Sequence, residues 1–116
     1  MGQETVEQRH EMKECADACT EARRVCEQTL AYCIEQGGDH VRPEHVQLMR
    51  DCIDICNTCM AACDRGSENC VAVCKACAEI SEKCADDCAS FQGDDQMEAC
   101  AQACRNAAKA ARVVSQ

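Results

Sequence analysis

The sequence predicts an all-α fold, an antiparallel up-down-up-down four-helix bundle with a cysteine-lined core. Three short breaks, at residues 37–43, 64–67 and 91–96, separate four segments rich in Ala, Glu, Gln, Lys and Arg, which favour helices. Because connections this short place successive helices side by side, neighbouring helices must run antiparallel. A chain of 116 residues is of single-domain size, so residues 1–116 are predicted to form one domain.

The first two helices are predicted over residues 5–36 and 43–64. Thr5 precedes Gln8 by three positions, which is the spacing of a capping box at a helix start. Pro43 suits the first turn of the second helix, where its missing N–H is not needed. The first helix is about ten residues longer than a helix that spans the bundle, so its start is expected to overhang the others.

The last two helices are predicted over residues 67–90 and 94–113. Ser67 and Asp94 are residue types that accept hydrogen bonds from the free N–H groups of a first turn. Glycine is favoured just after a helix because it adopts left-handed backbone angles without strain. The sequence places glycines at three such helix ends, namely Gly37, Gly66 and Gly93.

The cysteines recur along each predicted helix at steps of three and four residues, as in CIDICNTCMAAC at residues 52–63. Those steps define the inward-facing positions of a helical bundle. Every one of the 15 cysteines falls on such a position, and chance would scatter some to outer faces. The inward-facing set is Cys15, Cys19, Cys26, Cys33, Cys52, Cys56, Cys59, Cys63, Cys70, Cys74, Cys77, Cys84, Cys88, Cys100 and Cys104.

The usual core-forming residues are scarce, since the chain has one Phe, one Tyr and no Trp. Cysteine can act as a small hydrophobic residue, but this does not account for 15 of them in one core. Disulfides are disfavoured because the count is odd and because Cβ atoms four residues apart on a helix are about 5–6 Å apart, too far for a disulfide. The better interpretation is that the cysteines are metal ligands and the metal fills the core.

Thiolates are soft ligands that suit Cu(I), Zn(II) and iron–sulfur clusters. The loop motifs typical of iron–sulfur clusters are absent, and zinc requires four ligands per ion in separate tetrahedra, which a continuous column does not supply naturally. Cu(I) accepts two or three sulfurs, and a bridging thiolate serves two ions, so the core is predicted to hold on the order of 15 Cu(I). A zinc or general soft-metal buffer is the alternative. A thiol redox enzyme is less favoured, because it requires one exposed reactive pair, and no enzyme activity is expected.

The net charge of −9 argues against a nucleic-acid partner and is typical of a solvated acidic surface, although an interaction role for that surface stays open. No apolar run is long enough to cross a membrane, and the start of the sequence lacks an apolar secretory signal. The chain is therefore expected to be cytoplasmic and to bind no membrane.

The chain resembles the bacterial copper storage proteins, which are cysteine-lined four-helix bundles. The resemblance runs from about Cys15 to Val114. It implies Cu(I) storage inside the bundle, a homotetramer, membership of the cytosolic branch, and exchange with a copper chaperone or recipient protein. The fourth helix departs from the pattern, with two cysteines and an alanine-rich end. The resemblance rests on six C-x3-C pairs, Cys15/Cys19, Cys52/Cys56, Cys59/Cys63, Cys70/Cys74, Cys84/Cys88 and Cys100/Cys104.

In an up-down bundle the first and third loops lie at the same end. The inward-facing positions nearest that end are His45, Met49 and Met97, with Phe91 beside them and His40 in the loop. Imidazole and thioether bind Cu(I) more weakly than thiolate does. The resemblance to the copper storage proteins also implies that copper enters at this end. His45, Met49 and Met97 are therefore predicted to pass copper inward to the thiols. The alternative is that the two methionines only fill the core.

Overall fold

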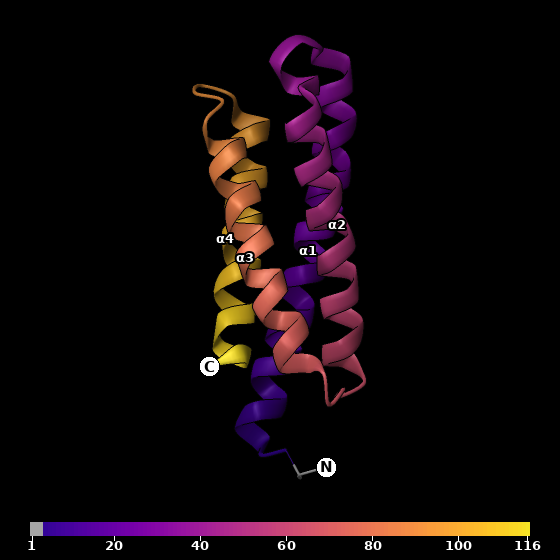
Figure 1. Cartoon of the computed structure of the whole chain (residues 1–116). Helices are drawn as coiled ribbons and strands as arrows, with labels where there is room; N and C mark the ends of the chain where they lie inside the picture. Colours follow the sequence, from indigo (N-terminus) through magenta and orange to yellow (C-terminus); the bar gives the residue numbers. More distant parts are fainter. Residues whose placement is uncertain (1–3) are drawn as a thin grey trace.

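The protein was analysed as a computed structural model that describes residues 4–116, and within this range it contains helices and no strand. The four long helices are α1 (Val6–Gln36), α2 (Pro43–Asp64), α3 (Cys70–Ala89) and α4 (Asp95–Ser115), and a short helix η1 (Gly38–Val41) joins α1 to α2. They form a rod of 50 × 21 × 19 Å in which successive helices run antiparallel (Figure 1). The predicted all-α four-helix bundle is confirmed.

Most of the predicted helix starts are confirmed by their capping contacts. The Thr5 hydroxyl accepts a hydrogen bond from the Gln8 backbone N–H at 3.0 Å, and the Gln8 side chain accepts one from the Thr5 N–H at 2.8 Å. Pro43 occupies the first turn of α2. The Asp94 carboxylate accepts from the Met97 N–H at 3.2 Å, which fixes the start of α4. Helix α4 then continues two residues beyond the predicted end at 113.

The prediction was wrong at the start of α3. Ser67 is not the cap of this helix, which begins at Cys70 and makes no side-chain cap bond. The Ser67 hydroxyl instead accepts from the Asn69 N–H at 3.0 Å, and the Ser67 carbonyl accepts from the Cys70 N–H at 3.1 Å. These bonds hold a turn in the chain between Asp64 and Cys70, so the first three residues of the predicted helix belong to that turn. Helix α3 ends at Ala89, which leaves Phe91 in the following loop.

The two ends of the rod differ. The α1–α2 connection and the α3–α4 loop lie together at one end, here called the His45 end (Figure 1). The α2–α3 turn lies at the opposite end, here called the Cys70 end, where the first turns of α1 project beyond the other helices. Glu4 lies against Gly66 of that turn. The predicted overhang of α1 is thus confirmed, and it borders the end of the bundle.

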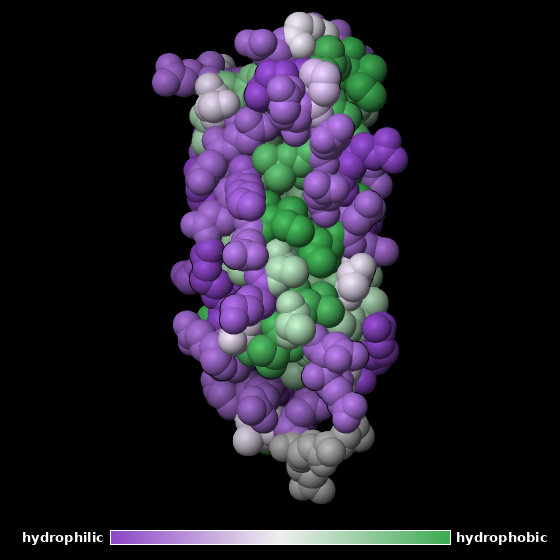
Figure 2. Space-filling view, in the orientation of Figure 1, coloured by the Kyte–Doolittle hydropathy of each residue, from purple (hydrophilic) through white to green (hydrophobic). Residues whose placement is uncertain are grey.

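The core consists of thiols, alanines and a few larger side chains. All 15 cysteines are buried and free, and none is more than 6% exposed. Between them lie alanines of α1, α3 and α4, while larger aliphatic side chains such as Ile55, Val73 and Ile80 are half-buried around the core. Figure 2 shows an apolar band along the rod between polar flanks. Over the described residues, no helix is both long and apolar enough to cross a membrane.

Candidate metal centre

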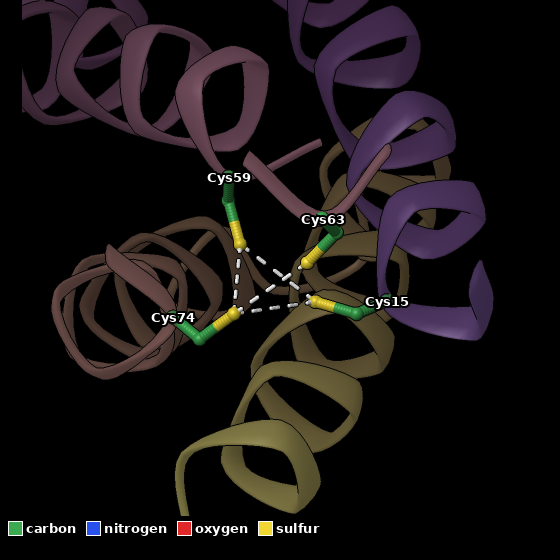
Figure 3. A group of neighbouring side chains, drawn as sticks. All are labelled: Cys15, Cys59, Cys63 and Cys74. Atoms are coloured by element: carbon green, nitrogen blue, oxygen red, sulfur yellow. Dashed lines mark hydrogen bonds between the residues drawn. The ribbon is translucent and has the colours of Figure 1, made fainter. Parts of the chain in front are cut away.

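The first group of thiols lies near the Cys70 end, where α1, α2 and α3 each direct cysteines to the bundle axis (Figure 3). It consists of Cys15, Cys59, Cys63 and Cys74, whose sulfurs all lie within 4.8 Å of one another. The Cys59 and Cys74 Sγ atoms are 3.4 Å apart, and Cys15 Sγ lies 3.7 Å from Cys59 Sγ. Cys70 extends the group, with its Sγ 3.3 Å from that of Cys63.

Two further groups continue the column towards the His45 end. Cys19, Cys56 and Cys77 form a group of three, in which Cys19 Sγ lies 3.7 Å from Cys77 Sγ. The third group has four thiols, which come from all four helices: Cys26, Cys52, Cys84 and Cys104. Cys100 adjoins it, with its Sγ 3.7 Å from that of Cys26. The structure therefore brings the predicted cysteines into one column.

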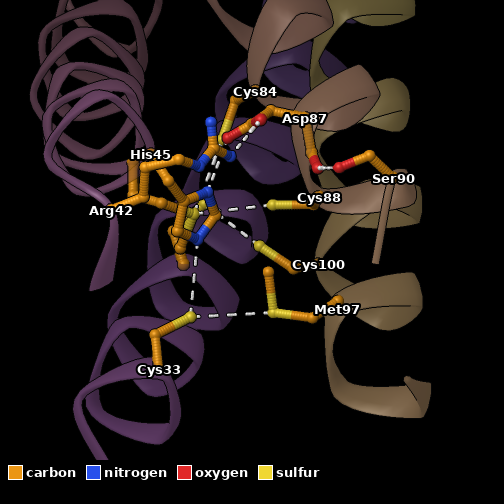
Figure 4. A network of polar contacts seen from close by, with 11 residues as sticks. Cys33, Arg42, His45, Cys84, Asp87, Cys88, Ser90, Met97 and Cys100 are labelled. Carbon is orange, nitrogen blue, oxygen red and sulfur yellow. Dashed lines mark hydrogen bonds and ion pairs between the residues drawn. The ribbon is translucent and has the colours of Figure 1, made fainter. Parts of the chain in front are cut away.

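Thioether and imidazole groups close the column at the His45 end (Figure 4). The Met49 sulfur lies 3.7 Å from Cys84 Sγ and 3.5 Å from Cys88 Sγ. The Met97 sulfur lies 3.6 Å from Cys33 Sγ. The His45 Nε2 atom lies 3.5 Å from the same Cys33 sulfur. All three side chains named from the sequence are buried and in contact with thiols.

Asp87 and Arg42, which sequence reasoning missed, orient His45. The Asp87 carboxylate lies 2.6 Å from His45 Nδ1 and 3.0 Å from an Arg42 guanidinium nitrogen. Burial alone would raise the pKa of Asp87, but these two contacts outweigh it and hold the pKa below its ordinary value. Because a carboxylate can only accept hydrogen bonds, His45 donates its Nδ1 proton to Asp87. When the ring is neutral, the Nε2 lone pair faces Cys33 and is free to bind a metal.

His40 does not reach the thiols. Its Nε2 atom lies 2.8 Å from the Asp94 carboxylate, which also accepts a hydrogen bond from the Tyr32 hydroxyl at 2.9 Å. Phe91 packs between the two histidines, with ring centroids 4.4 Å from His40 and 5.1 Å from His45. His40, Phe91 and Asp94 therefore form an outer layer over the His45 end.

The close packing of thiols alters their acidity. Hydrogen bonds with Cys19 and Cys59 lower the pKa of Cys15 to about 5, while the bond to Cys15 raises the pKa of Cys19. This contact therefore makes Cys15 the more acidic thiol of the pair. Near the other end, burial, the thiol of Cys100 and nearby carboxylates raise the pKa of Cys33 to about 11. Thiols with a raised pKa, such as that of Cys33, are protonated at neutral pH and must lose their protons when a cation binds.

The donor set suits soft cations. Thiolate and thioether sulfurs favour Cu(I), and oxygen-preferring cations are disfavoured because no carboxylate lies within the thiol groups. The two groups of four thiols also satisfy the ligand count of tetrahedral zinc. These two groups adjoin further thiols, such as Cys70 and Cys100, so they do not stand as separate sites. The group of three thiols and the contacts between groups fit two- and three-coordinate Cu(I) better.

Comparisons with known proteins agree with a copper-binding core. The family model described as copper storage protein matches residues 8–116. The uncharacterized cysteine-rich protein YhjQ of Bacillus subtilis is 31% identical over 89 residues, which are 77% of this chain and 82% of that protein. The Nmul_A1745 protein of Nitrosospira multiformis has a similar structure, with a TM-score of 0.85, 36% identity, and coverage of 91% of this chain and 95% of the other.

A metal-bound structure is also similar. The Cu(I)-bound copper storage protein BsCsp3 superposes with a TM-score of 0.82 at 29% identity, over 88% of this chain and 95% of that chain. The family match covers the whole cysteine column, from before Cys15 to the end of α4. The chain belongs to the copper storage protein family.

Proposed function

We propose that the protein stores Cu(I) in its core, on the order of one ion per cysteine, for copper storage or for buffering and detoxification. The observation that carries the proposal is the column of 15 buried, free thiols, in which neighbouring sulfurs lie 3.3–4.0 Å apart. A thiolate in such a column has neighbours on two sides, so it can bridge two ions. The Cu(I)-bound relative of the same family supports this assignment.

Charge balance supports storage of a monovalent cation. Fifteen thiolates without counterions would be prohibitively unstable in a buried core. One Cu(I) per thiolate leaves the core close to neutral, whereas one Zn(II) for every four thiolates leaves it strongly negative. Binding must release the protons of the thiols that are protonated beforehand, so uptake weakens as the pH falls.

His45, Met49 and Met97 are proposed as the ligands that admit copper at the His45 end. Their sulfur and nitrogen atoms lie between the outer layer and the thiols of Cys33, Cys84 and Cys88. A thioether or imidazole releases Cu(I) more readily than a thiolate does, so an ion held there can pass inward.

We further propose a cytoplasmic location, a homotetramer, and exchange with a copper chaperone or recipient protein. A reducing compartment keeps the thiols free, as the structure has them. The apolar band in Figure 2 supports association between copies. Sedimentation of the reduced protein tests the tetramer.

The storage function is tested by anaerobic titration of the reduced protein with Cu(I) against a competing chromophoric chelator. Storage predicts tight uptake of well over ten ions per chain, an expectation from bridging thiolates. The zinc alternative predicts preference for Zn(II) and saturation near the two groups of four thiols. If the protein saturates with Cu(I), as with Zn(II), at the few ions that these two groups can hold, the storage function is refuted.

A further inference from the structure

We infer that metal also enters and leaves at the Cys70 end, through a second opening whose first ligands are Cys63, Cys70 and Met12. This inference rests on the proposed Cu(I) storage and adds a route to it. Three features of the structure support it. A hydroxyl interrupts the thiol column, the thiols at this end are the most exposed of the 15, and cavities open above them.

The column of thiols is interrupted at Ser81, which supplies a hydroxyl in place of a thiol. Its hydroxyl oxygen is buried among the thiols of Cys52, Cys56 and Cys77, at 3.8, 3.6 and 3.7 Å. A hydroxyl is a harder donor than a thiol and binds Cu(I) poorly. Thiols lie on both sides of Ser81 along the column. Of these, one pair is in direct contact past Ser81, namely Cys52 and Cys56, whose sulfurs are 4.0 Å apart.

Ser81 therefore divides the cysteines into two sets. The seven on the His45 side are here called the upper thiols: Cys26, Cys33, Cys52, Cys84, Cys88, Cys100 and Cys104. The eight on the other side are called the lower thiols: Cys15, Cys19, Cys56, Cys59, Cys63, Cys70, Cys74 and Cys77. An ion admitted only at the His45 end must cross the single Cys52–Cys56 contact to reach the lower thiols.

The lower thiols have the more accessible end. Cys63 and Cys70 are 6% and 4% exposed, whereas the other cysteines are 1% exposed or less. Their sulfurs, 3.3 Å apart, form the shortest thiol contact in the column. At the His45 end, by contrast, the outermost thiol, Cys33, has no exposed surface.

Two surface cavities open above this pair. One, of about 280 Å³, is lined by Cys70, and the other, of about 500 Å³, is lined by Cys63. Met12 lines both cavities and is itself 9% exposed. Two thiols and a thioether beside open space are a soft donor set that a small copper carrier can reach.

The sulfurs behind this opening lead inward in short steps. Cys74 Sγ lies 3.7 Å from Cys63 Sγ and 3.8 Å from Cys70 Sγ. Cys59 follows at 3.4 Å from Cys74. In each transfer one Cu–S bond forms as another breaks, the proton of the receiving thiol passes to the thiolate that is released, and copper stays Cu(I).

The test follows which cysteines fill first. Cu(I)–glutathione is mixed anaerobically with the reduced full chain in substoichiometric amount. After increasing delays, excess N-ethylmaleimide is added in denaturant, which exposes the buried thiols that hold no copper. Peptide mass spectrometry then identifies the cysteines that copper has protected from alkylation. We expect Cys63, Cys70 and Cys74 to be protected at the earliest delays, together with the outermost upper thiols.

Cys70→Ser and Cys33→Ser are matched variants, because each removes one thiol at one end of the column. We expect Cys70→Ser to slow protection of the lower thiols several-fold and to leave the upper thiols unchanged, and Cys33→Ser to do the reverse. Met12→Leu keeps the apolar volume and removes the thioether, so it should slow only the lower thiols. Helicity measured by circular dichroism checks that each variant folds.

The results separate failure of the opening from failure of storage. If the wild-type chain takes up the full complement of copper, but the lower thiols are protected only after the upper ones, the second opening is refuted and storage stands. The same holds if Cys70→Ser fills the lower thiols at the wild-type rate. Saturation after only a few ions refutes storage itself.

Discussion

Replacing Asp87 by asparagine tests whether the His45 end is built to present an imidazole to copper. The carboxylate lies 2.6 Å from His45 Nδ1 and 3.0 Å from Arg42. Asparagine keeps the shape and one acceptor oxygen but loses the charge that fixes both partners. His45 is 1% exposed, so water cannot easily replace the lost interaction.

The expected loss of stability follows from these two contacts. A hydrogen bond to a charged group contributes about 1.5–3 kcal/mol, and that of Asp87 to His45 is partly buried. The Arg42 side chain is 38% exposed, so its pair with Asp87 contributes little. For a chain of this length, about 1.5–3 kcal/mol corresponds to a fall in melting temperature of about 5–15 °C. Loss of an outer partner of a metal-binding histidine also weakens metal binding by about 10–100-fold, here at the outermost site.

The difference between wild type and Asp87→Asn should depend on pH. Burial raises the pKa of Asp87, but the bonds from His45 and Arg42 outweigh it, so the folded-state pKa lies below the ordinary value of 3.8. The carboxylate therefore stabilises the fold above pH 3.8, and this contribution is lost as the pH falls through the lower folded-state pKa. The melting temperatures of the two proteins should converge in acid.

The assay is thermal melting of the reduced metal-free proteins, followed by stopped-flow uptake of Cu(I). Asp86→Asn is the matched control, because the Asp86 side chain is 74% exposed and lies 4.0 Å from Arg105. Total copper capacity should be the same in all three proteins. If Asp87→Asn melts and takes up copper as Asp86→Asn does, the assigned role of Asp87 is wrong.

Three further predictions concern the core. Replacing Met49 and Met97 together by leucine should slow Cu(I) uptake at unchanged capacity, measured by stopped flow, and unchanged kinetics would show that they only fill space. Ser81→Cys should raise capacity by about one ion in a chelator titration, and no increase would contradict storage of about one ion per thiol. Burial raises the pKa of Cys33 from 9.0 to about 11, so this thiol loses its proton at a lower pH in the unfolded chain than in the folded protein. The stability of the metal-free protein should therefore fall between these two pH values. Cys33→Ala should lessen that fall in pH-dependent melts, and an identical fall would refute the assignment.

The arrangement of the thiols could be predicted from sequence because it depends on local periodicity. Steps of three and four residues place side chains on one face of a helix, and short connections make neighbouring helices antiparallel, so that the four faces surround one axis. The start of α3 could not be predicted in the same way. Ser67 is a residue type that favours both a helix cap and a turn, and only the surrounding bonds decide that it accepts from Asn69 within the turn.

The network of polar contacts around His45 could not be predicted from the sequence, because its members are far apart in the chain. Asp87 lies 42 positions after His45, and Asp94 lies 54 positions after His40. Nothing in the spacing of these acids distinguishes them from the many acids on the surface. Their roles depend on how far α3 and α4 extend at the His45 end, which is fixed by packing.

Helix α4 packs in the bundle through alanines as well as thiols. Its two cysteines, Cys100 and Cys104, lie among the upper thiols, whereas buried alanines such as Ala107 and Ala111 lie further along the helix, towards the Cys70 end. Alanine favours the helix and lets neighbouring helices approach closely. The lower thiols still number eight, because α1, α2 and α3 supply all of them. The alanine-rich end of α4 therefore does not reduce the number of thiols for copper, and it provides a seam of contacts that does not depend on the metal.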